Sequence, residues 1–276
     1  HVIVQTEDIE QFEQYRDHPS VNLMSSEDVL PPEVERKRLY ARRMRDRLGR
    51  DATRILTSLA RYLVWPQWVR YTGWHTQQLI KLFVAANSGC EQVVVLDSDV
   101  IVTKQANERD FIAPSKAVCF AEVGRVGSVN SKVQNWNYQA RSLWGINPHN
   151  TDMDMYFDTP FVLYTPAIRD MQHKLEQTYQ LAWWQVLLKQ PPRRWSEFAT
   201  YIKYLRHMDH GLEVEWRNTT MCRYIFDASN PDSLEQQFAK HYDDPESHYV
   251  TIHSQSSGRQ LWDAAAYMDR FRRYIG

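Results

Sequence analysis

The chain has 276 residues, of which 43% are hydrophobic and 24% are charged, a composition typical of a folded globular protein and not of a disordered one. A chain of this length buries roughly 70–75% of the surface that its unfolded form exposes, which is enough for a substantial core. Its net charge of −1 excludes a general electrostatic attraction to nucleic acid, so we expect no nucleic-acid partner.

The cysteines and the hydropathy pattern bear on where the protein works. The three cysteines are odd in number and widely spaced, which favours a reducing compartment over a disulfide framework. No apolar run reaches the roughly 20 residues that a membrane-spanning helix needs. The first residues also lack the features of a signal peptide. We therefore expect a cytoplasmic protein.

The first residues predict alternating strands and helices. Val2–Val4 has the composition of a β-strand, residues 9–15 have helical character, and residues 21–24 form a second short apolar run. Alternation of this kind favours the α/β class, with a mostly parallel sheet flanked by helices. We expect one domain that spans residues 1–276.

A basic segment follows, with ten basic and four acidic residues between Glu33 and Arg61. Apolar residues at 39, 40, 44 and 48 have helical spacing, so the segment is predicted to be a helix. One interpretation is a solvated helix face, the usual fate of a charge run. The other is a docking surface for an anionic lipid or a phosphate-bearing acceptor, with residues 36–50 in peripheral contact with the inner face of a membrane.

The next stretch combines a helix, a strand and two carboxylates. Apolar residues form a helical stripe between residues 76 and 86, and Gly89 stands where a helix C-terminus favours glycine. The continuous apolar run 93–96 is typical of a strand buried in the middle of a parallel sheet. It leads directly into Asp97-Ser98-Asp99.

Later segments predict further elements. Strands are expected at residues 116–122 and 156–164, and helices at 167–178, 195–205 and 261–275. We expect residues 1–115 to form the half that binds nucleotide-sugar and metal, residues 116–258 the acceptor half, and residues 259–276 a C-terminal helix.

The carboxylates Asp97 and Asp99 carry the functional argument. Ligands of a parallel α/β sheet bind beyond the carboxyl ends of its strands, where two such side chains leave the sheet together. Their oxygens suit Mn²⁺ or Mg²⁺, and such an ion stabilises the charge that grows on a departing diphosphate. The alternative is that the two acids only end a strand and cap a turn.

Two other functions remain open. Phosphatases of the haloacid-dehalogenase type also carry an apolar strand that ends in Asp-x-Asp, with the first Asp as nucleophile. Their later acidic motif has no counterpart here, because Asp243-Asp244 follows no apolar strand. A non-catalytic glycan-binding module would keep the aromatic residues and tolerate the loss of Asp97.

Three segments give the chain a family resemblance. They are residues 73–82, with Gly-Trp and paired glutamines, the Val-Leu-Asp-Ser-Asp-Val run at residues 95–100, and Ser-Glu-Phe at residues 196–198. Over nearly its whole length the chain resembles a bacterial family of uncharacterised proteins assigned as GT-A-type glycosyltransferases. The resemblance implies a Rossmann-like fold, a nucleotide-sugar donor, and a metal ion on Asp97 and Asp99. It places the family's opening strand before His1.

The same reading assigns roles in donor binding and catalysis. Gln78, Lys81, Trp74 and Ser98 are expected to bind the donor, although the helix positions are equally consistent with solvent-facing polar groups and a packed tryptophan. Three further tryptophans, Trp136, Trp183 and Trp195, are weaker candidates for sugar stacking, with core packing as the alternative.

Glu197, at a predicted helix start, is the candidate general base, and Asp158 is the second candidate. The alternative for Glu197 is a capping role without chemistry. His253 is the candidate third metal ligand, and the alternative is a histidine bonded to backbone. By family setting, the acceptor is expected to be a glycan or a lipid-linked saccharide of the bacterial surface.

Overall fold

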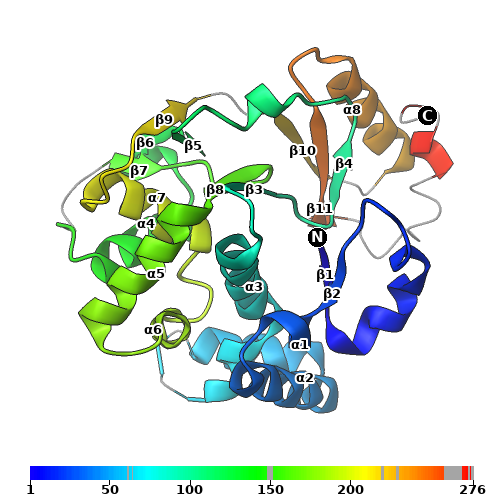
Figure 1. Ribbon diagram of the computed structural model, residues 1–276. Coiled ribbons are helices and arrows are strands. Elements are labelled where there is room, and N and C mark those ends of the chain that lie inside the picture. The colour runs from blue at the N-terminus through cyan, green and yellow to red at the C-terminus, as the bar shows by residue number, and fades with distance from the viewer. Residues whose placement is uncertain are drawn as a thin grey trace. The chain divides into compact units, whose positions relative to one another are not determined.

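The computed structural model describes residues 1–60, 62–63, 65–147, 152–218, 221–227, 230–257, 269–272 and 274, without the side chains of 253–257 (Figure 1). The protein is of the mixed α/β class, as predicted. The chain forms two compact units. Unit 1 comprises His1–Glu91, Val123–Met155 and Tyr164–Gly211, and unit 2 comprises Gln92–Glu122, Tyr156–Leu163 and Leu212–Gly276. Neither unit ends at the expected boundary of residue 115.

Unit 1 begins with a β-helix-β arrangement. Strand β1 (Val2–Val4) pairs in parallel with β2 (Leu23–Ser25), and the 3-10 helix η1 (Thr6–Tyr15) connects them. Short helix α1 (Ser26–Val29) follows with a capping box, in which Ser25 and Asp28 each bond the other's backbone N–H. The opening strand and the helical character after it were predicted from sequence.

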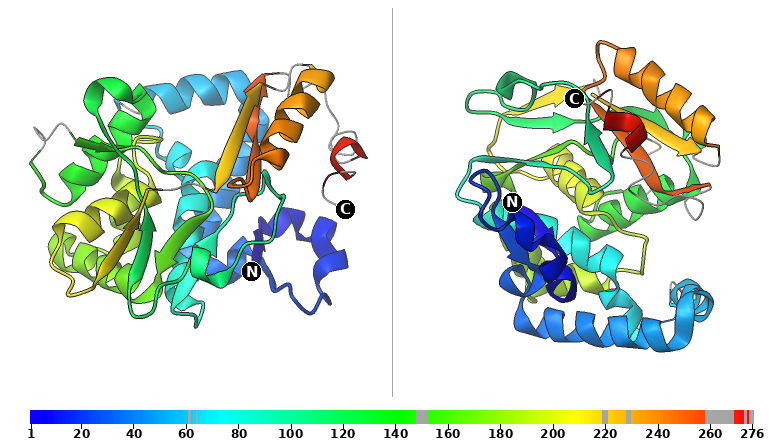
Figure 2. Two further views of the ribbon diagram at one scale, coloured as in Figure 1. Left: turned by 90° about the horizontal axis from the view of Figure 1, so that it is seen from above. Right: turned by 90° about the vertical axis from the view of Figure 1, so that its right-hand side faces the viewer.

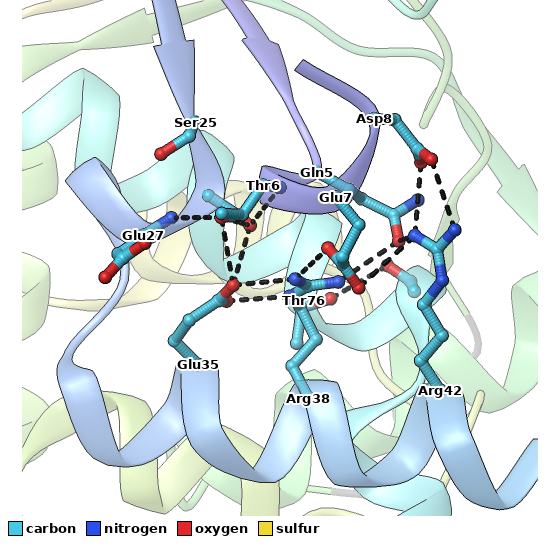
Figure 3. Close-up of polar contacts among 12 residues, drawn as sticks. Gln5, Thr6, Glu7, Asp8, Ser25, Glu27, Glu35, Arg38, Arg42 and Thr76 are labelled. Carbon is cyan, nitrogen blue, oxygen red and sulfur yellow. Dashed lines mark hydrogen bonds and ion pairs between the residues drawn. The ribbon is translucent and has the colours of Figure 1, made fainter. Parts of the chain in front are cut away.

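Helix α2 (Pro32–Leu59) contains the basic segment, and part of that segment faces inward (Figure 3). The Arg38 guanidinium is only 3% exposed and donates to both oxygens of Glu35 and to Glu7. Arg42 donates to both carboxylate oxygens of Asp8. These pairs fasten η1 to α2, so the segment is not a uniformly solvated face.

The rest of unit 1 is mainly helical. Its helices are η2 (Gln67–Tyr71), α3 (Gly73–Asn87), η4 (Val126–Ser128), α4 (Ser131–Leu143), α5 (Thr165–Tyr179), α6 (Trp183–Lys189) and α7 (Glu197–His207), and β6 (Val123–Arg125) pairs antiparallel with β7 (Asp152–Asp154). Helices α3, α5 and α7 contribute fully buried side chains such as Leu79, Ile168 and Ile202. The predicted helices at 76–86, 167–178 and 195–205 are thereby confirmed.

Unit 2 holds most of the strands. Strand β11 (Tyr249–Ser257) lies between β10 (Cys222–Asp227), its parallel neighbour, and β4 (Val100–Val102), its antiparallel neighbour. Strand β5 (Ala117–Phe120) pairs in parallel with β9 (Val214–Arg217), and β3 (Gln92–Val95) pairs with β8 (Phe161–Tyr164). Turn helix η3 (Glu108–Asp110) follows β4. Helix α8 (Pro231–Asp243) packs Leu234 and Phe238 on the strands.

The sheet differs from the sequence prediction. One mostly parallel sheet was expected, whereas the described strands form five small sheets with both parallel and antiparallel pairs. Strand β3 was expected in the buried middle of a sheet, yet β8 is its one neighbour among the described strands and Val94 is 38% exposed. A short apolar run does not reveal how many neighbours a strand has. The predicted helix 261–275 lies mostly outside the described residues.

His75, on the first turn of α3, is a buried and neutral histidine. Its Nε2 accepts the backbone N–H of Arg193 at 3.0 Å. Burial lowers the pKa of His75 to about 3, and the positive charges of Arg193 and Arg70 act in the same direction. A proton on this ring would remove the acceptor and place an unpaired charge in the core of unit 1.

We predict that His75 makes unfolding easier as the pH falls. The unfolded chain takes up a proton near pH 6.5 and the folded chain only near pH 3, so stability is lost as pH falls between these values. The loss from pH 7 to pH 5 is about 2 kcal/mol. Urea unfolding at both pH values measures it. His75→Gln should lose less between the two; an equal loss would contradict the prediction.

Candidate functional site

The candidate residues fall into two groups, one in each unit. Gln78, Lys81, Trp74 and Glu197 belong to unit 1, and Asp97, Ser98, Asp99, Asp158 and His253 belong to unit 2.

The two carboxylates of unit 2 lie on a tight turn between β3 and β4. Strand β3 ends at Val95, and the Asp97 carbonyl accepts the N–H of Val100 at 3.3 Å, which closes the turn. Asp97 and Asp99 are half-buried and Ser98 is exposed. The predicted position of the two aspartates, directly after a strand, is therefore confirmed, and both lie on the same turn.

Two segments from distant parts of the sequence hold this turn in place. The Asp97 N–H donates to Oγ1 of Thr159, a buried residue, at 3.3 Å. The Ile252 N–H donates to the Asp99 carbonyl at 3.2 Å, which extends the pairing of β11 with β4 (Figure 1). The residues beside Thr159 and Ile252 in sequence, Asp158 and His253, are thus on segments bonded to the turn.

Asp158 is exposed and lies near the half-buried phenol of Tyr224. The Tyr224 hydroxyl donates to the Thr159 carbonyl at 3.4 Å. Burial raises the pKa of Tyr224, and the negative charge of Asp158 raises it further. The tyrosine is therefore a protonated hydrogen-bond donor near a solvent-accessible carboxylate.

The described residues contain no group of three or more His, Cys, Asp or Glu side chains arranged to hold a metal ion. His253 lies in β11, directly after the residue bonded to Asp99, and its side chain is outside the described residues. Two carboxylates on one turn can still supply hard oxygen ligands to a divalent cation whose other positions are filled by water or phosphate. The chemistry of the pair fits Mg²⁺ or Mn²⁺.

In unit 1, Gln78, Lys81 and Glu197 meet between α3 and α7. Lys81 Nζ lies 3.1 Å from Glu197 Oε1, and the Gln78 amide nitrogen, turned toward the carboxylate, donates to both of its oxygens. The Ser196 hydroxyl donates to Glu197 Oε2 at 3.2 Å and also accepts the Ala199 N–H as the N-cap of α7. Glu197 is only 2% exposed, so the helix start is confirmed and its carboxylate is engaged inside the unit.

Three tryptophans of unit 1, at positions 74, 136 and 195, form an aromatic cluster. Trp74 is half-buried and stacks on Trp136 with ring centroids 6.3 Å apart, and the Trp195 ring meets it edge-on at 6.1 Å. Trp136, Trp183 and Trp195 are buried, which confirms the core-packing alternative for these three. Trp74 retains accessible surface.

Sequence reasoning missed Thr159 and Tyr224. Both contact the segment around Asp158 or the turn that carries Asp97. Neither lies in a motif, because each contact arises from the way that separate strands come together. The only sequence signal was that Thr159 follows Asp158, already a candidate.

Comparison with known proteins identifies the family of the chain but assigns it no function. A family model described as a family of unknown function, DUF6492, matches residues 1–272, so the chain belongs to that family. No curated protein matches the chain. Every helix among the described residues is too short or too polar to cross a lipid bilayer.

The buried pair of unit 1 gives a prediction about stability. Glu197→Gln leaves the Lys81 ammonium in a site from which water is largely excluded, and we expect a loss of about 3 kcal/mol. Adding Lys81→Met removes that stranded charge and should recover most of the loss. Urea unfolding of the single and double variants measures the coupling. If the effects of the two substitutions on the free energy of unfolding are additive, Glu197 and Lys81 do not stabilise each other and the prediction is wrong.

Proposed function

We propose that the protein is a metal-dependent glycosyltransferase of the GT-A type, which transfers a sugar from a nucleotide-sugar to an acceptor hydroxyl. The observation that carries the proposal is the turn with Asp97 and Asp99, held by hydrogen bonds to the segments that contain Asp158 and His253. Donor binding and acceptor activation at one site require metal ligands and a base on neighbouring segments, and these hydrogen bonds join the segments of all four residues.

In this proposal Asp97 and Asp99 hold Mn²⁺ or Mg²⁺, and His253 is the candidate third ligand. The bound ion would supply Lewis-acid stabilisation of the diphosphate leaving group. The chain's own contribution is to fix the carboxylates. Bonds from Thr159 and Ile252 restrain the turn on either side, so the two carboxylates need little reorganisation when the donor binds.

The structure favours Asp158 over Glu197 as the general base. A base must reach the acceptor hydroxyl, and Asp158 is exposed whereas Glu197 is buried. Glu197 would also have to give up its ion pair with Lys81 on taking a proton. We therefore assign Gln78, Lys81 and Glu197 to fixing α3 against α7, and retain Trp74 as a candidate for stacking on a base or sugar.

Donor binding provides the first test of the proposal. We expect one class among UDP-, GDP-, CMP- and dTDP-sugars to raise the melting temperature by roughly 5 °C at about 100-fold above Kd, only with Mn²⁺. Asp99→Asn should abolish the shift, because a carboxylate ligand is lost. The control Asp209→Asn changes an exposed acid of unit 1 and should leave the shift intact.

Stabilisation by phosphate analogues with no response to any donor would instead support the phosphatase alternative, in which Asp97 is a nucleophile. A metal-independent shift with saccharides alone, unchanged in Asp97→Ala, would support a glycan-binding module. Either result would reject the proposed transfer reaction.

Asp158→Asn tests the base. We expect kcat for sugar transfer to fall about 10²–10⁴-fold while donor Kd stays unchanged, because the amide cannot accept the acceptor's proton. The rise of kcat/KM with pH at its acidic limb should also disappear. Loss of donor binding with little change in kcat would show that Asp158 binds the donor and is not the base.

A further inference from the structure

Helix α2 presents a basic stripe on the side opposite its buried face. Arg36, Tyr40, Arg43 and Arg47 are exposed and follow one another at helical spacing. The buried residues of the helix are Val34, Glu35, Arg38, Ala41 and Thr57. Figure 2, right, shows α2 as the long light-blue helix, which lies along the rest of unit 1 on one side only. The stripe therefore faces solvent.

Beyond Gly49, where the helix kinks at φ 76°, large apolar side chains are exposed as well as charged ones. Tyr62 is 78% exposed and Trp65 is 70% exposed. Four aliphatic residues from the end of the stripe to Leu63 are also exposed: Leu48, Ile55, Leu59 and Leu63. Soluble proteins seldom leave so many large apolar side chains uncovered within one short segment, and such patches mark interaction sites.

Exposed arginines outnumber the one exposed acid, Asp51, among the described residues between Leu48 and Trp65. Arg50 and Arg54 are exposed between them, and the Arg194 guanidinium lies 4.9 Å from the Tyr62 ring centre. Within the described part of the chain, no ion pair involves Arg36, Arg43, Arg47, Arg50 or Arg54. Inward-facing Arg38 and Arg42, by contrast, pair with acids of η1 and α2. The cations of the outer face are thus available to an anionic partner.

We infer that this surface, hereafter the α2 surface (exposed residues 36–65), docks on an anionic phospholipid bilayer. Arginines reach lipid phosphates, while aliphatic side chains, Tyr62 and Trp65 enter the boundary between headgroups and acyl chains. A nucleic acid would use the arginines and leave the aliphatic side chains in water. The net charge of −1 gives no attraction of the whole molecule to an anionic surface, so binding would have to come from a local cluster of positive charge such as this one. The inference is independent of the proposed transferase activity.

Sedimentation with vesicles tests the inference on the full chain. We expect binding to phosphatidylcholine vesicles with 30% phosphatidylglycerol, and little binding to pure phosphatidylcholine. Arg43→Gln with Arg47→Gln should weaken binding about 25-fold, or about fivefold for each arginine. Ile55→Ser with Leu59→Ser should weaken it at least tenfold by removing apolar insertion. Raised salt should weaken binding of the wild type more than binding of the arginine variant, because the variant has two fewer exposed charges to screen.

A matched control separates the surface from net charge. Lys116→Gln with Arg272→Gln also removes two exposed positive charges, both in unit 2, and should leave vesicle binding within about twofold of wild type. Melting temperatures confirm that the variants are folded. The inference fails if neutral vesicles bind equally well, or if the control weakens binding as much. It also fails if the wild-type protein does not bind vesicles but binds single-stranded RNA, and the α2 variants lose that RNA binding.

Discussion

The pairing of β11 with β4 is the constraint on which the candidate site depends. Through it, the Ile252 N–H reaches the Asp99 carbonyl, so a strand from the C-terminal part of the chain restrains a turn from the first half. Strand β11 is in turn paired with β10 and packed against α8 through Val250, Ile225 and Phe238. The stability of this small core therefore determines how firmly the acidic turn is held.

The opposite side of the turn depends on a hydroxyl. Thr159 accepts the Asp97 N–H, and its own carbonyl receives the Tyr224 phenol from β10. An N–H without a partner away from water would cost free energy, so the bond to Thr159 stabilises this side of the turn. Because Asp158 precedes Thr159 in the chain, the same bond holds the Asp158 backbone near the turn. The backbone of this turn is thus held by hydrogen bonds within the chain before any ligand binds.

Local features of the fold could be predicted from sequence, and long-range pairings could not. The strand at Val2–Val4 and the helix at 76–86 follow from residue type and spacing, as does the start of α7 at Ser196. The number of neighbours of β3 does not, because pairing joins residues that no local pattern connects. The same limit applies to the site: Asp97 and Asp99 lie in a motif, whereas the fold alone brings Thr159 to Asp97 and Tyr224 to Thr159.

Residues of the same chemical type and similar sequence context differ in burial, and therefore in the roles that they can have. Arg38 and Arg43 belong to one basic run, yet the first is locked between Glu35 and Glu7 and the second is exposed on the α2 surface. Glu197 and Asp158 were both candidate bases, and the paired, buried state of Glu197 is the reason why we propose it as a positioning residue. Buried pairs of this kind are weak evidence for stability but restrict the arrangement of the helices that carry them.

The central claim is that Asp97 and Asp99 hold a metal ion together with a nucleoside diphosphate. Anomalous diffraction from crystals grown with Mn²⁺ and UDP tests it most directly, because data collected on both sides of the manganese absorption edge distinguish manganese from sulfur and phosphorus. The account predicts one peak about 2.2 Å from a carboxylate oxygen of Asp97 or Asp99, with diphosphate oxygens completing the coordination. A bound nucleotide with manganese elsewhere, or with none at this turn, would contradict it.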